Sequence, residues 1–463
     1  MIPVVAIVGR PNVGKSTLFN RLAGSRIAIV HDRPGVTRDR HYDITERWGD
    51  REIMLIDTGG FEPDPEDELF RGVSQQALAA VDEADIVIFV VDGRAGVTPV
   101  DEEVARILRS SARPVLLAPN KVESDAVEAD AQEFYRLGLG DLFPISAEHG
   151  RGIHTLMDRV LELVPPLDTR PITHLPHADI EDAEDDERPA ELRVAIIGRP
   201  NIGKSTLINN LLGEYRHVVH DMPGTTMDAI DSKVTYDGQQ YLLVDTAGVR
   251  RKARVSDAVE GFAVSRAIRA IERCHVTLLM IDGTEGPTEQ DARLARLVED
   301  RGRALGILVN KWDLVRENPE RNVHVLRDEF DRKIKHLDWA PVLYISALTG
   351  KGTHRIWQMV QDLYRTFDTR IPTAECNRFL EAAMRSHSVP QRHRRPVRLN
   401  YMTQIRVRPP TFAVWCNTPE GVTEPYKRYL RNRLRETYEL AGTPIRLQFK
   451  QKRRPGDPHP GDE

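Results

Sequence analysis

The sequence predicts an α/β protein made of two tandem copies of one domain, followed by a smaller α+β domain. Three observations lead to this prediction. Residues 9–17 recur almost unchanged as residues 198–206, the same short motifs follow each copy, and the pattern of apolar residues changes after residue 367. A chain of 463 residues also exceeds what one hydrophobic core usually supports.

The duplication extends well beyond these glycine-rich segments. Each is followed by an Asp-Thr-x-Gly segment, an Asn-Lys segment and a Ser-Ala pair, in one order and at nearly one spacing. These begin at Asp57, Asn120 and Ser146 in the first copy, and at Asp245, Asn310 and Ser346 in the second. Because a chance recurrence would not keep order and spacing, we expect two complete domains rather than one site and a decoy.

Within each copy, short apolar runs alternate with helical patterns. Helices are expected at segments such as 17–22 and 102–109. The apolar runs are rich in Val and Ile and bounded by turn residues, as in strands buried on both faces; they are 4–8, 53–57, 85–92 and 114–120, then 193–198, 241–246, 276–282 and 304–310. This alternation predicts a mostly parallel sheet with helices on both faces.

The C-terminal segment has a different pattern. Helical stripes at 379–384 and 426–434 are combined with segments that alternate as strands do, at 397–401, 411–416 and 445–449. A small α+β domain fits this order.

Domain boundaries are expected from composition. They give a first α/β domain at 1–167, a linker at 168–191, a second α/β domain at 192–367, a basic domain at 368–454 and a disordered tail at 455–463. Seven of the nine residues 179–187 are acidic, and such a block repels itself and cannot bury a core. Residues 370–454 contain 19 Lys and Arg against 6 Asp and Glu, although the whole chain has a net charge of −5. The basic end predicts an anionic partner.

Several classes of protein are disfavoured. No apolar run reaches the roughly eighteen residues of a membrane span, and the N-terminal sequence enters the first glycine-rich segment without a basic leader. Cys274, Cys376 and Cys416 are far apart and odd in number, so they predict neither disulfides nor a zinc site. We expect a cytoplasmic protein without a membrane span.

The repeated segments read GRPNVGKST and GRPNIGKST. A GxxxxGK[ST] loop between a strand and a helix wraps a polyphosphate with main-chain N–H groups at the positive end of the helix. Lys15 and Lys204 would reach the β- and γ-phosphates, while the hydroxyls of Ser16 and Ser205 would bind Mg²⁺.

Two further segments predict a metal site and a switch. Asp57 and Asp245 end apolar strands, so each carboxylate can hold the metal through water, and the following glycines, Gly60 and Gly248, can donate an N–H to the γ-phosphate. The segments HDRPGVTRDR and HDMPGTTMDA place one threonine each, Thr37 and Thr226, to close on Mg²⁺ and γ-phosphate and to be released after hydrolysis.

Asn310-Lys311-Trp312-Asp313 predicts a reader of guanine. The carboxylate of Asp313 can accept hydrogen bonds from N1 and N2 of guanine, a pair that adenine lacks, so ATP would be rejected. A main-chain N–H of the Ser346-Ala347 pair, or of Ser146-Ala147 in the first copy, would support the base at O6.

The first copy departs from this pattern, because it reads Asn120-Lys121-Val122-Glu123. Glutamate can make the same contact, although its extra methylene adds a rotatable bond and moves the carboxylate by about one bond length. We expect guanine specificity to survive with weaker affinity. Asp125 is an alternative reader.

Neither copy carries the water-orienting glutamine of Ras-like GTPases after its Asp-Thr-x-Gly segment. Phe61 and Val249 stand there instead, and an apolar side chain cannot position water. Either hydrolysis is slow or another group supplies the missing charge.

Together these motifs resemble the Der (EngA) family, the bacterial double Era-like GTPases of the TRAFAC class. The resemblance rests on both GRPNxGKST loops, the PGxT segments, DTGG and DTAG, the NKxE and NKWD readers and the ISA segments. PPTF, YKRYLRNRLRE and GTPIRLQF extend it to the family's C-terminal KH-like module. It covers nearly the whole chain and implies two P-loop GTPase (G) domains plus an α+β KH-like domain.

The resemblance implies a GTPase that binds ribosomal RNA and acts in late assembly of the large ribosomal subunit, as a monomer and without a DNA partner. GTP or GDP and Mg²⁺ are the implied cofactors. In relatives lacking the glutamine, hydrolysis is stimulated by K⁺, which would be held here by Asn12 and Asn201. A loop-shaping role for these two asparagines is equally open.

The residues expected to contact nucleotide fall in four segments of each copy. Of these, Lys15 and Lys204 are expected to be catalytic with Thr37 and Thr226, and Ser16, Thr37, Asp57, Ser205, Thr226 and Asp245 to bind Mg²⁺. The full set is Gly9, Arg10, Pro11, Asn12, Val13, Gly14, Lys15, Ser16, Asp57, Thr58, Gly59, Gly60, Phe61, Asn120, Lys121, Val122, Glu123, Ser146 and Ala147, then Gly198, Arg199, Pro200, Asn201, Ile202, Gly203, Lys204, Ser205, Asp245, Thr246, Ala247, Gly248, Val249, Asn310, Lys311, Trp312, Asp313, Ser346 and Ala347.

The C-terminal domain also departs from the KH pattern. Up to residue 454 its only glycines are Gly421 and Gly442, so it has no GxxG, and the usual KH grip on single-stranded RNA is missing. RNA contact would then come from arginines elsewhere, including the clusters at 392–395 and 452–454. The basic residues 250–252 could couple the second nucleotide state to RNA or to this domain.

Two rival functions are disfavoured by the sequence. A metabolic or transport GTPase is disfavoured by the lack of membrane spans and of a cofactor site near the C-terminus. An RNA-binding scaffold with one degenerate G domain is disfavoured by the intact lysine, serine and aspartate of both copies.

Overall fold

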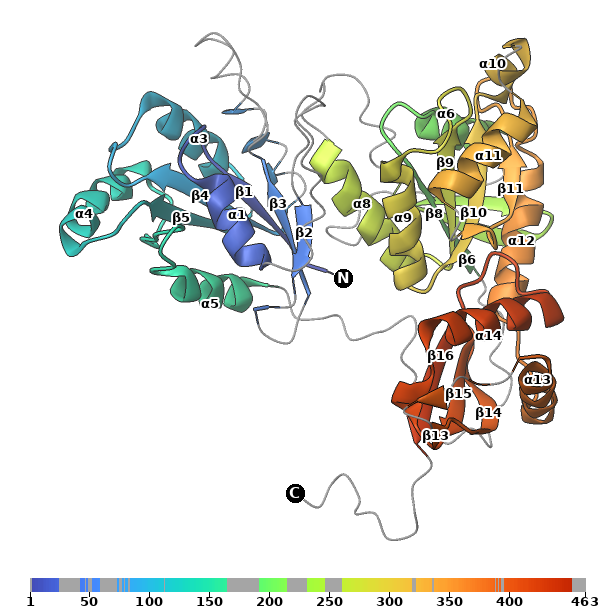
Figure 1. Ribbon diagram of the computed structural model, residues 1–463. Coiled ribbons are helices and arrows are strands. Elements are labelled where there is room, and N and C mark those ends of the chain that lie inside the picture. Colours follow the sequence, from blue (N-terminus) through green and yellow to red (C-terminus); the bar gives the residue numbers. More distant parts are fainter. Residues whose placement is uncertain are drawn as a thin grey trace. The chain divides into compact units, whose positions relative to one another are not determined.

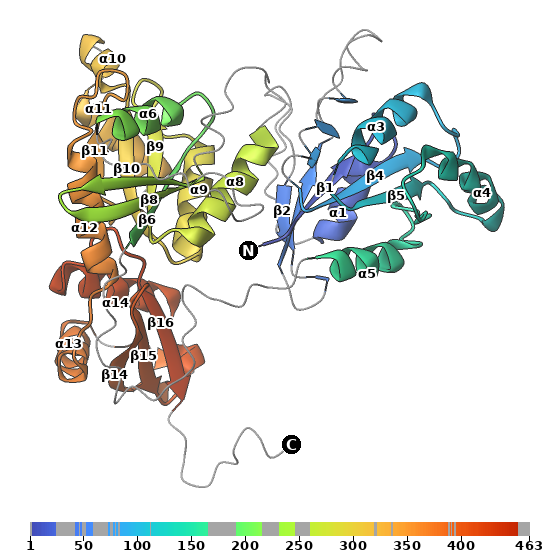
Figure 2. The same ribbon diagram turned by 180° about the vertical axis from the view of Figure 1, so that it is seen from behind.

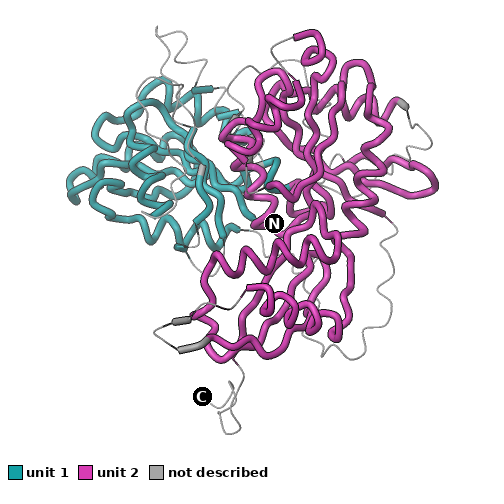
Figure 3. The backbone as a smooth tube through the Cα atoms, turned by 45° about the vertical axis from the view of Figure 1, so that its right-hand side comes forward, with its two compact units in different colours: residues 1–170, 252–269 teal, residues 171–251, 270–463 magenta. Residues whose placement is uncertain are grey.

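The computed structural model is shown in Figure 1 and, from behind, in Figure 2. It describes residues 2–24, 42–45, 47–48, 52–58, 73–74, 77–78, 80–81, 84–111, 113–164, 191–214, 231–245, 260–318, 322–334, 337–387, 389, 391–392 and 395–451. These form two compact units, Met1–Arg170 with Lys252–Arg269 and Pro171–Arg251 with Ala270–Glu463 (Figure 3). Most of the second α/β domain thus shares a unit with the C-terminal domain.

The first α/β domain has a five-stranded sheet in the order β2-β3-β1-β4-β5, parallel except for the pairing of β2 with β3. Its strands are β1 (Val4–Val8), β2 (Tyr42–Thr45), β3 (Ile53–Asp57), β4 (Ile86–Asp92) and β5 (Val115–Asn120). The helices are α1 (Lys15–Ala23), α3 (Pro99–Arg109), α4 (Asp125–Asp130), the 3₁₀ helix η1 (Ala131–Leu137) and α5 (Ile153–Leu163). Every residue of β1, β3 and β4 is buried, as expected of strands covered on both faces.

The second α/β domain repeats this topology with one more strand, in the order β11-β10-β9-β6-β8-β7. Its strands are β6 (Glu191–Ile197), β7 (Ser232–Tyr236), β8 (Gln239–Val244), β9 (Val276–Asp282), β10 (Ala304–Asn310) and β11 (Val342–Tyr344). The helices are α6 (Lys204–Glu214), α8 (Glu260–Arg273), α9 (Glu289–Asp300), α10 (Trp312–Glu317), α11 (Val323–Lys333) and α12 (Arg355–Phe367). As in the first copy, only the pairing of the hairpin partners β7 and β8 is antiparallel. The predicted duplication is therefore present in three dimensions.

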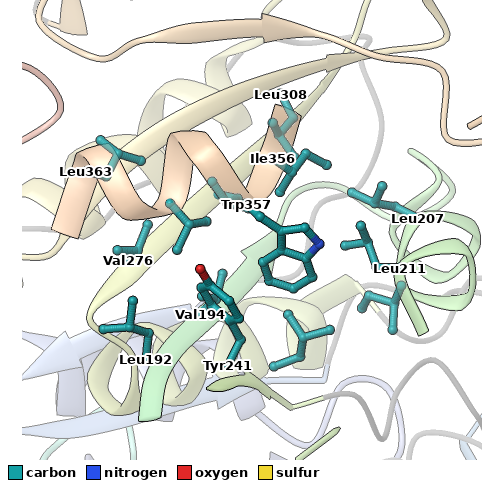
Figure 4. Close-up of a cluster of buried hydrophobic side chains, with 14 of the residues drawn as sticks. Leu192, Val194, Leu207, Leu211, Tyr241, Val276, Leu308, Ile356, Trp357 and Leu363 are labelled. Carbon is teal, nitrogen blue, oxygen red and sulfur yellow. The ribbon is translucent and has the colours of Figure 1, made fainter. Parts of the chain in front are cut away.

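The cores of the two copies are built alike. On one face of each sheet, the helix after the glycine-rich loop and the last helix of the domain pack together: α1 with α5, and α6 with α12. Trp357 of α12 lies at the centre of the second core, with its ring centroid 4.5 Å from that of Tyr241 and with Leu207 and Leu211 of α6 beside it (Figure 4). This packing fixes the helix that follows each glycine-rich loop.

The C-terminal domain is α+β, as predicted. It contains α13 (Thr373–Ser386), β12 (Gln391–Arg392), β13 (Arg395–Pro396), β14 (Leu399–Arg406), β15 (Thr411–Cys416), the 3₁₀ helix η3 (Pro419–Gly421), α14 (Glu424–Thr437) and β16 (Arg446–Gln451). The sheet β14-β15-β16 carries both long helices on one side (Figures 1 and 2). The three cysteines of the chain are buried and free, in agreement with their expected role as small apolar residues.

The expected alternation of Val397, Leu399 and Tyr401 is interrupted. The pairing of β14 with β15 shifts register between Leu399 and Tyr401, so the next core residue is Met402 and Tyr401 is 43% exposed on the other face of the sheet. An extra residue in one strand reverses which side chains face the core.

Main-chain hydrogen bonds join the C-terminal domain to the second α/β domain. The amide of Leu305 donates to the carbonyl of Gly442 at 2.8 Å, and the amide of Gly442 donates to the carbonyl of Trp339 at 2.8 Å. The guanidinium of Arg446 donates to the carbonyl of Asp300 at 2.7 Å. Because strand β10 is part of this junction, the third domain is packed directly against the second sheet.

Candidate nucleotide-binding sites

Each glycine-rich loop connects a central strand to a helix, β1 to α1 and β6 to α6. Gly14 has φ of 94°, and a Cβ there would lie 2.3 Å from Nδ2 of Asn120. Gly203 has φ of 105°, and its Cβ would lie 2.4 Å from Nδ2 of Asn310. Only glycine fits either position, since both the left-handed backbone and the close approach exclude a side chain.

The two loop lysines fold over their own loops. Nζ of Lys15 donates to the carbonyl of Arg10 at 2.8 Å, and Nζ of Lys204 donates to the carbonyls of Gly198 and Arg199 at 2.7 and 2.6 Å. Burial lowers the pKa of Lys15, although the charge of Asp57 opposes this shift. Each ammonium therefore lies within the concave side of a loop built to surround an anion.

The structure brings together the first pair of expected metal ligands. Oγ of Ser16 donates to Oδ2 of Asp57 at 2.8 Å, and Asp57 is buried. A hydroxyl and a carboxylate at the phosphate end of the loop form a donor set suited to Mg²⁺, which prefers oxygen ligands. In the second copy the amide of Asp245 donates to Asp231, whose other oxygen is 2.5 Å from Arg273. Thr58 donates its hydroxyl to the carbonyl of Ile7, so it ties β3 to β1.

A buried asparagine joins the loops of each site. Nδ2 of Asn120 donates to the carbonyl of Val13 at 2.7 Å, and Oδ1 accepts from the amide of Ala147 at 2.9 Å. Asn310 makes the same contacts with Ile202 and Ala347, both at 2.8 Å. A main-chain N–H of each Ser-Ala pair is expected to support the base, and in this structure the N–H of Ala147 or Ala347 is engaged with the asparagine.

The lysine of each Asn-Lys pair is held by an aspartate that sequence reasoning missed. Nζ of Lys121 lies 2.6 Å from Asp92, and Nζ of Lys311 lies 2.5 Å from Asp282. Burial acts to raise the pKa of each aspartate, but the lysine hydrogen bond brings both pKa values below their usual range. The signal was present, because an Asp-Gly pair ends the same apolar strand in both copies.

A second missed contact fixes the arginine of each loop. Nε of Arg10 is 3.6 Å from Asp101, and Nε of Arg199 is 3.4 Å from Asp291. Both aspartates belong to capping boxes, with Thr98 and Thr288 as N-caps of α3 and α9. A Thr-x-x-Asp pattern is a recognised helix-start signal, so it could have been found in the sequence.

The two carboxylates that are expected to read the base, Glu123 and Asp313, have different surroundings. Oδ1 of Asp313 is buried and has no hydrogen-bond partner among the described residues. A buried oxygen of this kind fits a donor from a bound base, because leaving it unpaired is unfavourable. Oε2 of Glu123 instead lies 2.5 Å from Arg94, while the alternative reader Asp125 is bound to Arg151 at 2.7 Å.

Other expected residues are placed as follows. Asn12 and Asn201 have φ of 64° and 59°, which agrees with a loop-shaping role and leaves a role in K⁺ binding as a prediction. Val122 and Val13 are buried, and Trp312 packs on Tyr344 with ring centroids 4.3 Å apart. Several predicted residues lie outside the described part of the chain: Thr37, Gly59, Gly60, Phe61, Thr226, Thr246, Ala247, Gly248 and Val249.

Comparison with known proteins agrees with this double site. A family model described as "50S ribosome-binding GTPase" matches residues 4–121 and again 193–311. One described as "KH-domain-like of EngA bacterial GTPase enzymes, C-terminal" matches residues 370–450. The chain is 48% identical over 455 residues to GTPase Der of Myxococcus xanthus, which covers 97% of this chain and 96% of that protein. The chain belongs to the Der family of GTPases.

Other members of the Der family are nearly as similar. Identity is 46% over 451 residues with GTPase Der of Moorella thermoacetica, covering 97% of this chain and 99% of that protein. It is 45% over 450 residues with GTPase Der of Caldanaerobacter subterraneus, covering 97% and 98%. The predicted family and fold class are confirmed, and membership implies a GTP hydrolase that uses GTP or GDP and Mg²⁺. Among the described helices, none combines the length and apolar composition needed to cross a membrane.

Proposed function

We propose that this protein is a GTP-controlled assembly factor that binds ribosomal RNA during late maturation of the large ribosomal subunit. It acts as a cytoplasmic monomer and hydrolyses GTP slowly, with stimulation by K⁺. The observation that supports this most directly is the packing of a strongly basic third domain against the second of two nucleotide-binding domains, at the start of β10.

Each site would bind the nucleotide with the same parts. Main-chain N–H groups of the loop and the ammonium of Lys15 or Lys204 would surround the phosphates. Ser16 with Asp57, and Ser205 with Asp245, would hold Mg²⁺, which supplies positive charge against the phosphate oxygens. Glu123 and Asp313 would read guanine, and Thr37 and Thr226 would change position with the state of the γ-phosphate.

The third domain offers a surface suited to single-stranded RNA. Tyr401, Trp415 and Lys450 are paired across the three strands of its sheet, on the face opposite its core. The ring centroids of Tyr401 and Trp415 are 5.4 Å apart, and Nζ of Lys450 is 5.9 Å from the Trp415 centroid. Aromatic rings beside cationic side chains stack bases and neutralise phosphates, which replaces the missing GxxG contact.

Co-sedimentation with isolated large ribosomal subunits tests whether the protein binds this subunit and whether the bound nucleotide controls the binding. We expect pelleting with a non-hydrolysable GTP analogue and little with GDP at moderate salt. Protein that stays in the supernatant with both nucleotides would leave the GTPase assignment intact and end the ribosomal role.

Point variants test the RNA surface. Tyr401→Ser and Lys450→Gln should each weaken binding of a single-stranded oligoribonucleotide by about three- to tenfold, because one stacked base or one phosphate contact is lost. Tyr135→Ser is the matched control, since Tyr135 is an exposed tyrosine (52%) of the first domain. Equal affinity for all three variants would show that RNA binds elsewhere.

Replacing K⁺ by Na⁺ tests the cation. Turnover should slow if Asn12 and Asn201 hold K⁺ beside the phosphates. An unchanged rate would leave these two residues with the loop-shaping role alone.

A further inference from the structure

The two copies hold their base-reading carboxylates in different ways. In the first, Nη2 of Arg94 lies 2.5 Å from Oε2 of Glu123. In the second, the position of Arg94 is taken by Thr284, whose hydroxyl and amide both bind Asp282, at 2.6 and 2.9 Å. The change from aspartate to glutamate therefore coincides with an arginine that reaches the longer side chain.

The charges around the two readers also differ. The ligand atoms of Glu123, Glu148 and His149 all lie within 4.8 Å of one another, and Nε2 of His149 is 3.7 Å from Glu123. The second copy has Leu348 and Thr349 at the corresponding positions. At this position the first copy therefore has a second carboxylate beside its reader, where the second copy has a leucine, and like charges at this distance repel. Arg94 supplies the opposite charge that holds Glu123 in place.

Arg94 is itself fixed by the Asn-Lys segment. Its amide donates to Oδ1 of Asp92 at 3.0 Å, while Oδ2 of Asp92 binds Lys121 at 2.6 Å. Nζ of Lys121 also donates to the carbonyl of Asn12 in the phosphate loop at 2.9 Å. A continuous series of contacts therefore connects the phosphate loop to the carboxylate of Glu123.

We propose that Arg94 is a positioning residue for guanine recognition at the first site. It restricts the extra torsion of Glu123 and overcomes the repulsion from Glu148, so that the carboxylate is presented to N1 and N2 of the base. A carboxylate has about four acceptor positions, so binding Arg94 leaves room for both guanine donors. This inference rests on the proposed guanine-nucleotide function of that site.

An ordinary surface ion pair is the alternative explanation. The side chains of Arg94 and Glu123 are 52% and 36% exposed, and such pairs contribute little to folding stability. The test must therefore measure base recognition rather than stability. Inosine diphosphate is a suitable probe, because it lacks the N2 amino group of guanosine diphosphate and is otherwise the same ligand.

The experiment uses the full-length chain with Asp313→Asn in every variant, so that the second site no longer prefers guanine. Displacement of fluorescent GDP by GDP and by inosine diphosphate gives the base preference of the first site. Arg94→Thr should reduce that preference by about three- to tenfold, the order expected when one side-chain torsion is released. Arg106→Thr, which removes an exposed ion pair with Glu103 on α3, should not change it.

A double variant completes the test. Arg94→Thr with Glu123→Asp recreates the Thr284 and Asp313 pair of the second copy, and it should restore the preference to within about twofold of the starting chain. An unchanged preference in Arg94→Thr, or a double variant as poor as the single one, would overturn the inference while GDP binding remains. Absence of GDP binding at the first site of the starting chain would overturn the proposed function as well.

Discussion

The two α/β domains are most alike at the phosphate loop and differ at the opposite end of the sheet. In the first copy, the amide of Val4 donates to Oδ2 of Asp85 at 2.8 Å. In the second, the corresponding amide of Arg193 donates to Nδ1 of His275 at 3.1 Å. A carboxylate and an imidazole thus perform the same task, which is to accept the first strand's N–H beside the next strand.

This contrast shows which features the fold requires and which it leaves free. An acceptor at that position is required, since the strand's N–H is otherwise unpaired, but its chemical type can vary. At the loops, by contrast, the lysine, the asparagine and the close-packed glycine share a contact in both copies, which for the lysine is the carbonyl of Arg10 or Arg199. The shared set is therefore the part expected to carry catalysis.

The largest expected effect is on GTP hydrolysis, when the phosphate-loop lysine of one site is removed and the other site is left intact. Lys15→Ala and Lys204→Ala should each lower GTP hydrolysis at the altered site by at least about 100-fold, because a cation aimed at the phosphates is lost. Single-turnover hydrolysis with each variant measures this. Full wild-type activity in either variant would show that its site is idle.

Acid should act differently on the two copies. Burial, assisted by the charges of Arg193, Arg303 and Arg408, lowers the pKa of His275 from 6.5 to about 4. Between pH 6.5 and pH 4 the histidine is protonated in the unfolded chain but neutral in the folded chain. The free energy of unfolding is therefore unaffected by this group above pH 6.5 and decreases as the pH falls towards 4. The expected loss is about 3 kcal/mol.

Unfolding in guanidinium between pH 4 and 7 checks this, followed by tryptophan fluorescence. His275→Asn cannot be protonated in this range, so its stability should depend less on pH. If wild type and variant show the same pH dependence, His275 is not the group responsible.

A smaller effect on stability is expected at Gly442, where the third domain packs against the second α/β domain. Gly442 has φ of 69°, and a Cβ there would lie 1.9 Å from Leu363 and 3.1 Å from the carbonyl of Leu305. Gly442→Ala should destabilise the second unit by about 2 kcal/mol through strain and overpacking. Gly140→Ala in the first domain is the control, because its φ is also positive, at 87°, but no atom lies within 4 Å. Similar losses of thermal stability for both variants would contradict close packing at Gly442.

The smallest effect is the loss of stability when a helix N-cap is removed, and it should be equal in both copies. Thr98→Ala and Thr288→Ala each remove an N-cap that accepts a main-chain hydrogen bond, at an expected loss of about 1 kcal/mol. Hydrogen exchange at the first turns of α3 and α9 measures each locally. A clear difference between the copies would mean that the two capping boxes are not equivalent.

Much of the fold could be predicted because buried parallel strands leave uninterrupted apolar runs. The strands at Val4–Val8, Val276–Asp282 and Thr411–Cys416 were predicted at their observed bounds. The bulge that turns Tyr401 outward was not, since it depends on pairing with a strand whose register the sequence does not specify locally.

In the candidate sites, too, local features could be predicted and contacts between distant segments could not. Loop residues were found because their spacing is local and repeated. The contacts Arg94–Glu123 and Arg10–Asp101 join segments distant in sequence, and each involves residues with an ordinary surface interpretation. Only the sheet that brings the ends of β1, β4 and β5 together makes them neighbours.

The junction at Gly442 has a consequence for constructing shorter forms of the protein. A chain cut after Phe367 would expose the side chain of Leu363, which is otherwise only 2% exposed, and would leave the amide of Leu305 without the carbonyl it binds. Such a fragment would expose an apolar side chain beside an unpaired main-chain N–H. Aggregation or altered hydrolysis could then result from the truncation itself rather than from the loss of RNA contact. Substitutions on the outer face of β14, β15 and β16 are therefore the cleaner way to separate RNA contact from GTP turnover.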